Sequence, residues 1–85
     1  MKLDENLAAI VSGGASGLGA AVVRHLRDRE VKTALFDKDE DAGRQIASES
    51  GSTFFKVDVS DSQSVRTALS AARKKNGQEQ LVVNC

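Results

Sequence analysis

The period of hydrophobicity changes repeatedly along this chain, and that change limits its possible folds more than any other feature. Four short apolar stretches have the length and composition of buried strands: residues 7–12, 32–36, 53–59 and 81–83. Three amphipathic segments of helical period separate them: residues 18–29, 39–50 and 61–76. A helix between two strands connects them in parallel, with a right-handed crossover. The sequence therefore predicts an α/β fold in the order βαβαβαβ, the N-terminal half of a doubly wound parallel sheet.

The predicted helices carry their own start and stop signals. Three acids at residues 39–41 suit the positive end of a helix dipole, and either Ser60 or Asp61 can cap the third helix. Gly51 and Gly77 follow the second and third helices, where glycine commonly ends a helix. The stripe expected to face the sheet from the first helix is Leu18, Val22 and Leu26.

Composition argues against several classes of protein. Twelve Lys and Arg balance twelve Asp and Glu, which argues against a basic surface for nucleic acid and against an electrostatic membrane anchor. The longest apolar run, residues 7–11, is far shorter than the roughly 20 residues that span a bilayer. A single cysteine, Cys85, argues against a disulfide framework and a cysteine zinc site. We expect a cytoplasmic protein without a metal site.

The last residues predict that the domain is incomplete. Residues 80–85 stop at the tip of a strand without a turn or cap. In a doubly wound sheet this strand is central, so its free edge would be unpaired and apolar, a feature that natural domains cover or blunt. A chain of 85 residues is also small for a stable core. We expect residues 1–85 to be a partial domain truncated at the fourth strand, poorly soluble or self-associating when isolated.

A glycine-rich turn, residues 12–19, joins the first strand to the first helix with the spacing G-x-x-x-G-x-G. In a dinucleotide turn, Gly13 would permit the sharp exit from the strand and Gly17 would let the backbone approach a pyrophosphate. Gly19 would let the helix pack close to the sheet, and free N–H groups at the helix start would face the anion. The alternative is a tight turn without a ligand. A P-loop is excluded, because no Gly-Lys-Ser/Thr follows.

Asp37 closes the second strand 18 positions after Gly19, where an acid can accept hydrogen bonds from both ribose hydroxyls of NAD. A 2′-phosphate would be repelled there, since two like charges about 4 Å apart cost roughly 4 kcal/mol at an effective dielectric of 20. NAD is therefore favoured over NADP, although Lys38 softens the repulsion. The alternative is a solvated acid that caps the second helix, a role for which Asp39 is better placed.

The turn Ser-Gly-Gly-Ala-Ser-Gly-Leu-Gly resembles the cofactor turn of the short-chain dehydrogenase/reductase family, T-G-x-x-x-G-x-G, with Ser12 in place of Thr. Asp58-Val59 resembles the D-V pair that contacts adenine, with capping of the third helix as the alternative for Asp58. Residues 83–85 resemble the opening of the N-N-A-G motif, with Cys85 in place of the second Asn. The resemblance extends over essentially the whole chain and looks nearest to members that act on 3-hydroxyacyl-CoA or related hydroxy substrates.

This resemblance implies a Rossmann fold in an NAD-dependent oxidoreductase that transfers hydride between an alcohol or ketone and nicotinamide, with an acyl-CoA among the candidate substrates. The implied parent is a homo-oligomer. The family's catalytic Asn, Ser, Tyr and Lys would lie beyond residue 85, so no catalytic residue is assigned and the fragment is expected to be inactive. The alternatives are a non-catalytic truncated nucleotide-binding module and a methyltransferase-type Rossmann half. The implied cofactor-binding residues are Gly13, Ser16, Gly17, Leu18, Gly19, Asp37, Asp58, Val59, Asn84 and Cys85.

Overall fold

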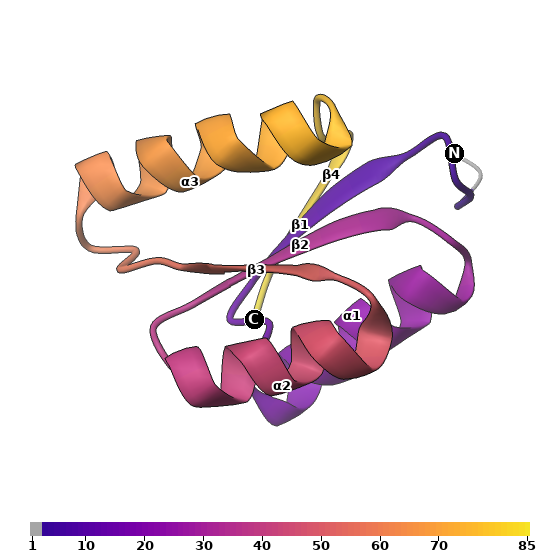
Figure 1. Cartoon of the computed structure of the whole chain (residues 1–85), viewed down its shortest axis with the longest axis horizontal. Coiled ribbons are helices and arrows are strands. Elements are labelled where there is room, and N and C mark those ends of the chain that lie inside the picture. Colours follow the sequence, from indigo (N-terminus) through magenta and orange to yellow (C-terminus); the bar gives the residue numbers. More distant parts are fainter. Residues whose placement is uncertain (1–2) are drawn as a thin grey trace.

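The computed structural model describes residues 3–85, and its elements follow the predicted order (Figure 1). The strands are β1 (Ala8–Ser12), β2 (Lys32–Asp37), β3 (Thr53–Lys56) and β4 (Leu81–Asn84). The helices are α1 (Gly17–Asp28), α2 (Glu40–Ser50) and α3 (Ser62–Asn76). The strands form one parallel sheet in the order β3-β2-β1-β4. The predicted half of a doubly wound sheet is confirmed.

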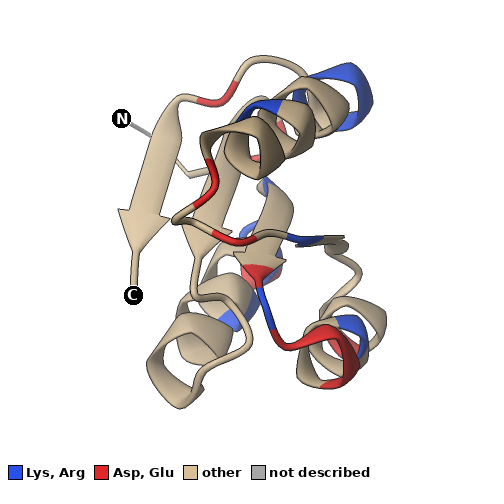
Figure 2. Cartoon of the chain, turned by 90° about the vertical axis from the view of Figure 1, so that its left-hand side faces the viewer, with Lys and Arg blue, Asp and Glu red and all other residues tan. Residues whose placement is uncertain are grey.

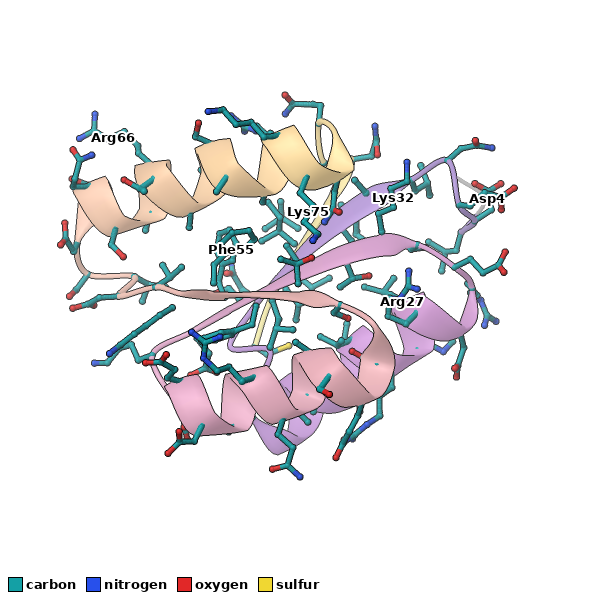
Figure 3. All side chains as sticks on the ribbon, viewed as in Figure 1. Asp4, Arg27, Lys32, Phe55, Arg66 and Lys75 are labelled. Atoms are coloured by element: carbon teal, nitrogen blue, oxygen red, sulfur yellow. The ribbon has the colours of Figure 1, made fainter. Side chains whose placement is uncertain are left out.

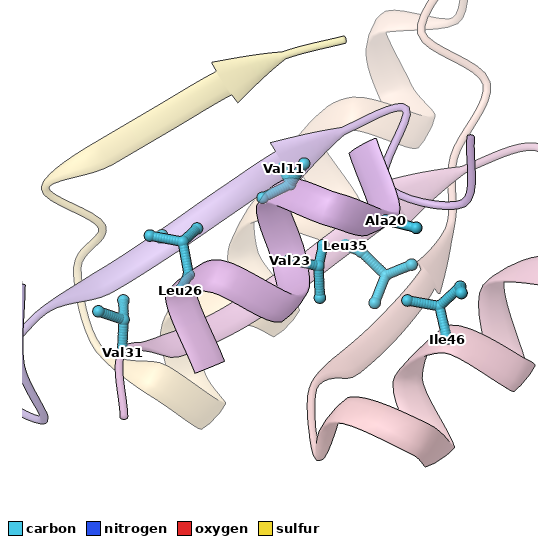
Figure 4. Packing of buried hydrophobic residues seen from close by; sticks show 8 residues of the cluster. Val11, Ala20, Val23, Leu26, Val31, Leu35 and Ile46 are labelled. Atoms are coloured by element: carbon cyan, nitrogen blue, oxygen red, sulfur yellow. The ribbon is translucent and has the colours of Figure 1, made fainter. Parts of the chain in front are cut away.

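The helices lie on both faces of the sheet, with α1 and α2 on one face and α3 on the other (Figure 1). Alternation along β1 therefore divides the core in two. Val11 belongs to one cluster with Val23 of α1 and Ile46 of α2 (Figure 4), whereas Ile10 belongs to the other, with Ala72 of α3. Val11 and Val23 are completely buried, and burial of such a side chain contributes roughly 1.5–3 kcal/mol.

Aromatic packing closes the α3 side of the core. Phe55 of β3 lies between the sheet and α3 (Figure 3). Its ring meets that of Phe36 edge-on, with the centroids 5.9 Å apart, the arrangement that aromatic quadrupoles favour. Phe36 is buried in this part of the core, and Phe55 is partly buried against it.

Most helix ends follow the sequence signals. Asp39 caps α2, and its carboxylate accepts a hydrogen bond from the amide of Ala42 at 3.1 Å. Gly51 ends α2 in the left-handed conformation, with φ of 77°, where glycine has no steric penalty. Of the two candidate caps for α3, the structure uses Asp61.

Two local predictions are wrong. Leu18 does not face the sheet but is 71% exposed, because α1 presents Gly19 and Ala20 to the sheet one position later. The third strand was expected over residues 53–59 but ends at Lys56. Val57 still donates its amide to the carbonyl of Asp37 at 3.0 Å. The chain then turns away at Asp58, so Asp58 and Val59 lie in a loop.

The outer strand β4 pairs only with β1 among residues 3–85. Its Val82 is 57% exposed, while Leu81 and Val83 are half-buried on the opposite face. The expected apolar edge is therefore present, whereas poor solubility of the chain stays a prediction. Within residues 3–85, none of the helices combines the length and the hydropathy needed to cross a bilayer.

An ion pair fixes the connection between α3 and β4. Arg73 donates through Nε and Nη2 to the two carboxylate oxygens of Glu79, at 2.9 and 2.8 Å. The Glu79 side chain is only 12% exposed, and the hydrogen bonds from Arg73 lower its pKa from 4.5 to about 2. Next to it, the amide of Ala8 donates to the Gln80 side chain at 2.9 Å. These contacts set where β4 begins to pair with β1.

We expect Glu79→Gln to lower the free energy of unfolding by roughly 1 kcal/mol at pH 7, the scale of a well-aligned bidentate pair with one exposed partner. The pKa of Glu79 is lower in the folded state than its ordinary value of 4.5. Its contribution is thus fully present above about pH 4.5 and is lost as the pH falls toward 2. Urea unfolding of wild type and variant across this range measures the difference, which should shrink with acid; a difference independent of pH would contradict this account.

Candidate dinucleotide-binding site

The carboxyl ends of the strands meet at one edge of the sheet, the edge at which doubly wound folds bind ligands. A hollow of about 310 Å³ lies there. Its walls come from the ends of β1, β2 and β4 and from the loop after β3. The lining residues are Ser12, Gly13, Phe36, Asp37, Lys38, Val57, Val59 and Cys85. The hollow thus brings together four predicted site residues, Gly13, Asp37, Val59 and Cys85.

Larger hollows, of about 390 and 430 Å³, run along the outer side of α3. Arg66, Ser70 and Lys74 line both of them. They are grooves between side chains of a single helix, and no loop or strand end converges on them. The basic residues in the last turn of α3 interact favourably with the dipole of that helix. They lie away from the acidic start of α2 (Figure 2). The sheet edge is therefore a better candidate site than these two grooves.

Three glycines of the turn, Gly13, Gly14 and Gly19, leave no room for a side chain. Gly13 has φ of 74°, and a Cβ there would stand 2.5 Å from the carbonyl oxygen of Cys85. A Cβ on Gly19 would overlap the carbonyl oxygen of Gly13. Gly17 differs, because a Cβ there would meet no atom within 4 Å. Gly17 therefore has no steric reason within this chain to be glycine.

The amides of the turn divide into two groups. Gly13 and Gly14 donate to the carbonyl of Phe36, at 2.8 and 3.4 Å, and Ala15 donates to the Asp37 carboxylate. These three N–H groups point back to β2. The amides of Gly17 and Leu18, the first two of α1, have no acceptor among residues 3–85, as is usual at a helix start. The predicted free N–H groups are therefore present at the positive end of the helix dipole.

Ser16 is committed to the turn. Its hydroxyl donates to the carbonyl of Gly13 at 2.8 Å and accepts from the amide of Gly19 at 3.1 Å. Ser16 is thus the N-cap of α1, a role that sequence reasoning missed. A hydrogen bond from this hydroxyl to a phosphate would require it to leave Gly13.

Asp37 lies half-buried at the end of β2. Its Oδ1 accepts from the amide of Asp39 at 3.0 Å, and its Oδ2 accepts from the amide of Ala15 at 3.1 Å. Each carboxylate oxygen can accept a second hydrogen bond, so both retain capacity for a ligand hydroxyl. Because Asp39 caps α2, the helix-cap alternative for Asp37 is not what the structure has.

Asp58 lies beside the hollow rather than in its wall. Its Oδ1 accepts from the hydroxyl and the amide of Ser60, at 2.6 and 3.0 Å. These bonds, the hydroxyl first, lower the pKa of Asp58 below its ordinary value. Oδ2 has no donor among residues 3–85, and α3 is capped by Asp61. The Asp58 carboxylate therefore remains an ionised acceptor next to the exposed side chain of Val59.

The residues at the end of β4 are placed differently from each other. Asn84 is exposed and pairs with Ser12 in the sheet register. Cys85 lines the hollow, and its amide donates to the carbonyl of Ser12 at 2.9 Å. The backbone thus ties β4 to the turn. No cluster of three or more potential metal ligands occurs in the part of the chain that the structure describes.

Sequence reasoning missed Gly14 of the turn and two residues of the wall. Gly14 is buried, and a Cβ there would stand 2.5 Å from Cβ of Leu35. A glycine outside the G-x-x-x-G-x-G spacing was the available signal. Phe36 and Val57 had no such signal, because their places in the wall depend on how the strands align. Lys38, which the sequence analysis placed near Asp37, also lines the hollow.

The chain is similar in sequence to known dehydrogenases. The model of the family described as short chain dehydrogenase matches residues 7–85. The 3-hydroxyacyl-CoA dehydrogenase type-2 of Drosophila melanogaster is 37% identical over 83 residues, which are 95% of this chain and 32% of that protein. The 3-beta-hydroxysteroid dehydrogenase of Comamonas testosteroni is 38% identical over 78 residues, 89% of this chain and 31% of that protein.

Solved structures agree on the fold. A 3-ketoacyl-(acyl-carrier-protein) reductase from Brucella melitensis complexed with NADH superposes with a TM-score of 0.89 at 23% identity, over 95% of this chain and 34% of that one. A short chain dehydrogenase from Bacillus anthracis gives 0.91 at 13% identity, over 99% and 36%. The chain spans about a third of the length of the relatives it matches. Since the family model covers nearly all of it, the chain belongs to the short-chain dehydrogenase family.

Proposed function

We propose that residues 1–85 are a partial dinucleotide-binding domain that holds the adenosine diphosphate half of NAD. The observation that carries this proposal is the pair of free amides at Gly17 and Leu18, on the same sheet edge as the Asp37 carboxylate. Free N–H groups at a helix start favour an anion, and a carboxylate at the end of the next strand favours a ribose diol. The residues present therefore fit the group.

Each part of the nucleotide has a chemically matched partner in this proposal. The pyrophosphate binds the amides of Gly17 and Leu18, where the absence of a Cβ on Gly17 lets it approach. The ribose hydroxyls donate to Asp37. The adenine amino group donates to Asp58, and the ring contacts the apolar wall at Val59. Gly13 and Gly19 act by keeping the turn tight, Ser16 by capping α1, and Asn84 and Cys85 through the backbone at the end of β4.

The whole protein is proposed to be an NAD-dependent oxidoreductase that acts on an alcohol or ketone. The bound nicotinamide would supply hydride transfer, while the residues of this chain bind and orient the cofactor. None of them is assigned to proton transfer, so the 85-residue chain by itself is expected to have no dehydrogenase activity. Relatives named for 3-hydroxyacyl-CoA and 3-beta-hydroxysteroid support a small hydroxy substrate, with an acyl-CoA among the candidates. We also propose that the whole protein is cytoplasmic and forms a homo-oligomer.

Ligand fragments test which half of the cofactor this chain binds. ADP-ribose should bind with a Kd within about threefold of that of NAD, because both carry the adenosine diphosphate group. Nicotinamide mononucleotide should show no binding at millimolar concentration. Isothermal titration of the three ligands makes the comparison. Equal affinity for nicotinamide mononucleotide would contradict the proposal.

Gly17→Ala should show whether glycine at this position is required for ligand binding or for the stability of the fold. A methyl group there meets no protein atom within 4 Å, so the free energy of unfolding should change by less than about 1 kcal/mol. ADP-ribose affinity should fall by about tenfold or more, because the methyl group blocks close approach of the pyrophosphate. The contrasting variant is Gly19→Ala, which should lower stability by roughly 1–3 kcal/mol through overpacking. Unchanged affinity in folded Gly17→Ala would show that Gly17 does not contact the ligand.

Asp37→Ala should change the choice of cofactor. NAD should lose roughly 1.5–3 kcal/mol of binding free energy, the scale of hydrogen bonds to a charged group, whereas NADP is also relieved of charge repulsion. The ratio of the two affinities should therefore move toward NADP. Asp39→Ala removes the same charge two residues away and should leave the ratio nearly unchanged. If both variants give the wild-type ratio, Asp37 does not select the cofactor.

A further inference from the structure

We propose that the Asp37 carboxylate is also a positioning group, which fixes the glycine turn to the end of β2 before any ligand binds. The inference rests on the proposed function, because the turn carries the amides assigned to the pyrophosphate. Its observation is the hydrogen bond from the amide of Ala15 to Oδ2 of Asp37, at 3.1 Å between residues 22 positions apart. Oδ1 of the same carboxylate accepts from the amide of Asp39 at 3.0 Å.

The end of β2 is the anchor of the turn. Three consecutive amides, those of residues 13–15, donate to acceptors on Phe36 and Asp37. The first two go to the main-chain carbonyl of Phe36, at 2.8 and 3.4 Å, and the second of these is long. The third goes to a side chain. Of the hydrogen bonds that hold the turn to β2, the one to Asp37 is therefore the nearest in sequence to the free amides of Gly17 and Leu18.

The contacts further along the turn are internal to it. The amide and the hydroxyl of Ser16 both donate to the carbonyl of Gly13, at 3.2 and 2.8 Å. They keep the turn closed but do not hold it to β2. Ala15 stands two residues before Gly17, so the direction of the Gly17 and Leu18 amides depends on where Ala15 is held. The direction of the amides proposed to bind the pyrophosphate therefore depends on Asp37, the acid proposed to bind the ribose.

The affinity for a ligand without ribose distinguishes a positioning role of Asp37 from a ribose contact alone. Inorganic pyrophosphate carries only negative charge, so removal of a nearby carboxylate should strengthen its binding if charge were the only effect. If Asp37 holds the turn, removal should disorder the donors and weaken binding. Asp39→Ala makes the same change of charge nearby and leaves the Ala15 bond in place, which makes it the matched control.

The first test is amide hydrogen exchange in the ligand-free chain, measured by NMR. In Asp37→Ala the amide of Ala15 should exchange about tenfold faster or more, the effect of losing a hydrogen bond to a charged acceptor. In Asp39→Ala its rate should stay within about twofold of wild type. Amides of β1 should be unaffected in both variants, which separates a local change from loss of the fold. Asp37→Asn keeps one acceptor oxygen and should restore part of the protection of Ala15 or Asp39.

The second test is the affinity of the same variants for inorganic pyrophosphate. Asp37→Ala should bind it about threefold more weakly, or worse, than Asp39→Ala. Unchanged exchange of Ala15 in folded Asp37→Ala would overturn the proposal, as would pyrophosphate binding equal to or tighter than that of Asp39→Ala. A wild-type chain that fails to bind ADP-ribose would count against the proposed function only, because the exchange measurement contains no ligand.

Discussion

The contact between Gly19 and Gly13 determines where α1 can begin. A Cβ on Gly19 would overlap the carbonyl oxygen of Gly13, and because that oxygen belongs to the main chain, no side-chain movement can relieve the clash. Glycine at this position lets the helix start directly at the end of β1. The amides of Gly17 and Leu18 consequently end up at the carboxyl edge of the sheet. The proposed anion site and the packing of α1 on the sheet therefore share one cause.

The strand next to β1 holds the turn in place. Leu35 of β2 is fully buried and packs against the backbone of Gly14, while the carbonyl of Phe36 accepts two of the turn amides. The rigidity of the core thus reaches the turn through β2. At its carboxyl end the same strand carries Asp37, whose charge can select the ribose. The end of β2 therefore provides both a buried, apolar support for the turn and a half-buried, polar contact for a ligand.

The sequence predicted well those features that depend on local patterns. Hydrophobic period fixed the order of strands and helices, and short-range capping chemistry identified Asp39 and Gly51 as helix ends. Burial of Leu18 was predicted wrongly, because a regular stripe ignores how closely the glycine turn draws α1 to the sheet. The bond between Ala15 and Asp37 could not be predicted, because it joins residues 22 positions apart through the register of β1 and β2. The ligand roles of the site residues remain predictions.

Binding of an adenine dinucleotide at the sheet edge, rather than on the outer side of α3, is tested most directly by a chemical-shift map of the ¹⁵N-labelled chain titrated with ADP-ribose. We expect the largest amide shifts at Gly17 and Leu18, with smaller shifts near Asp37 and Val59 and none along α3 from Arg66 to Lys74. Shifts concentrated on α3, or an unchanged spectrum at millimolar ADP-ribose, would contradict binding at the sheet edge.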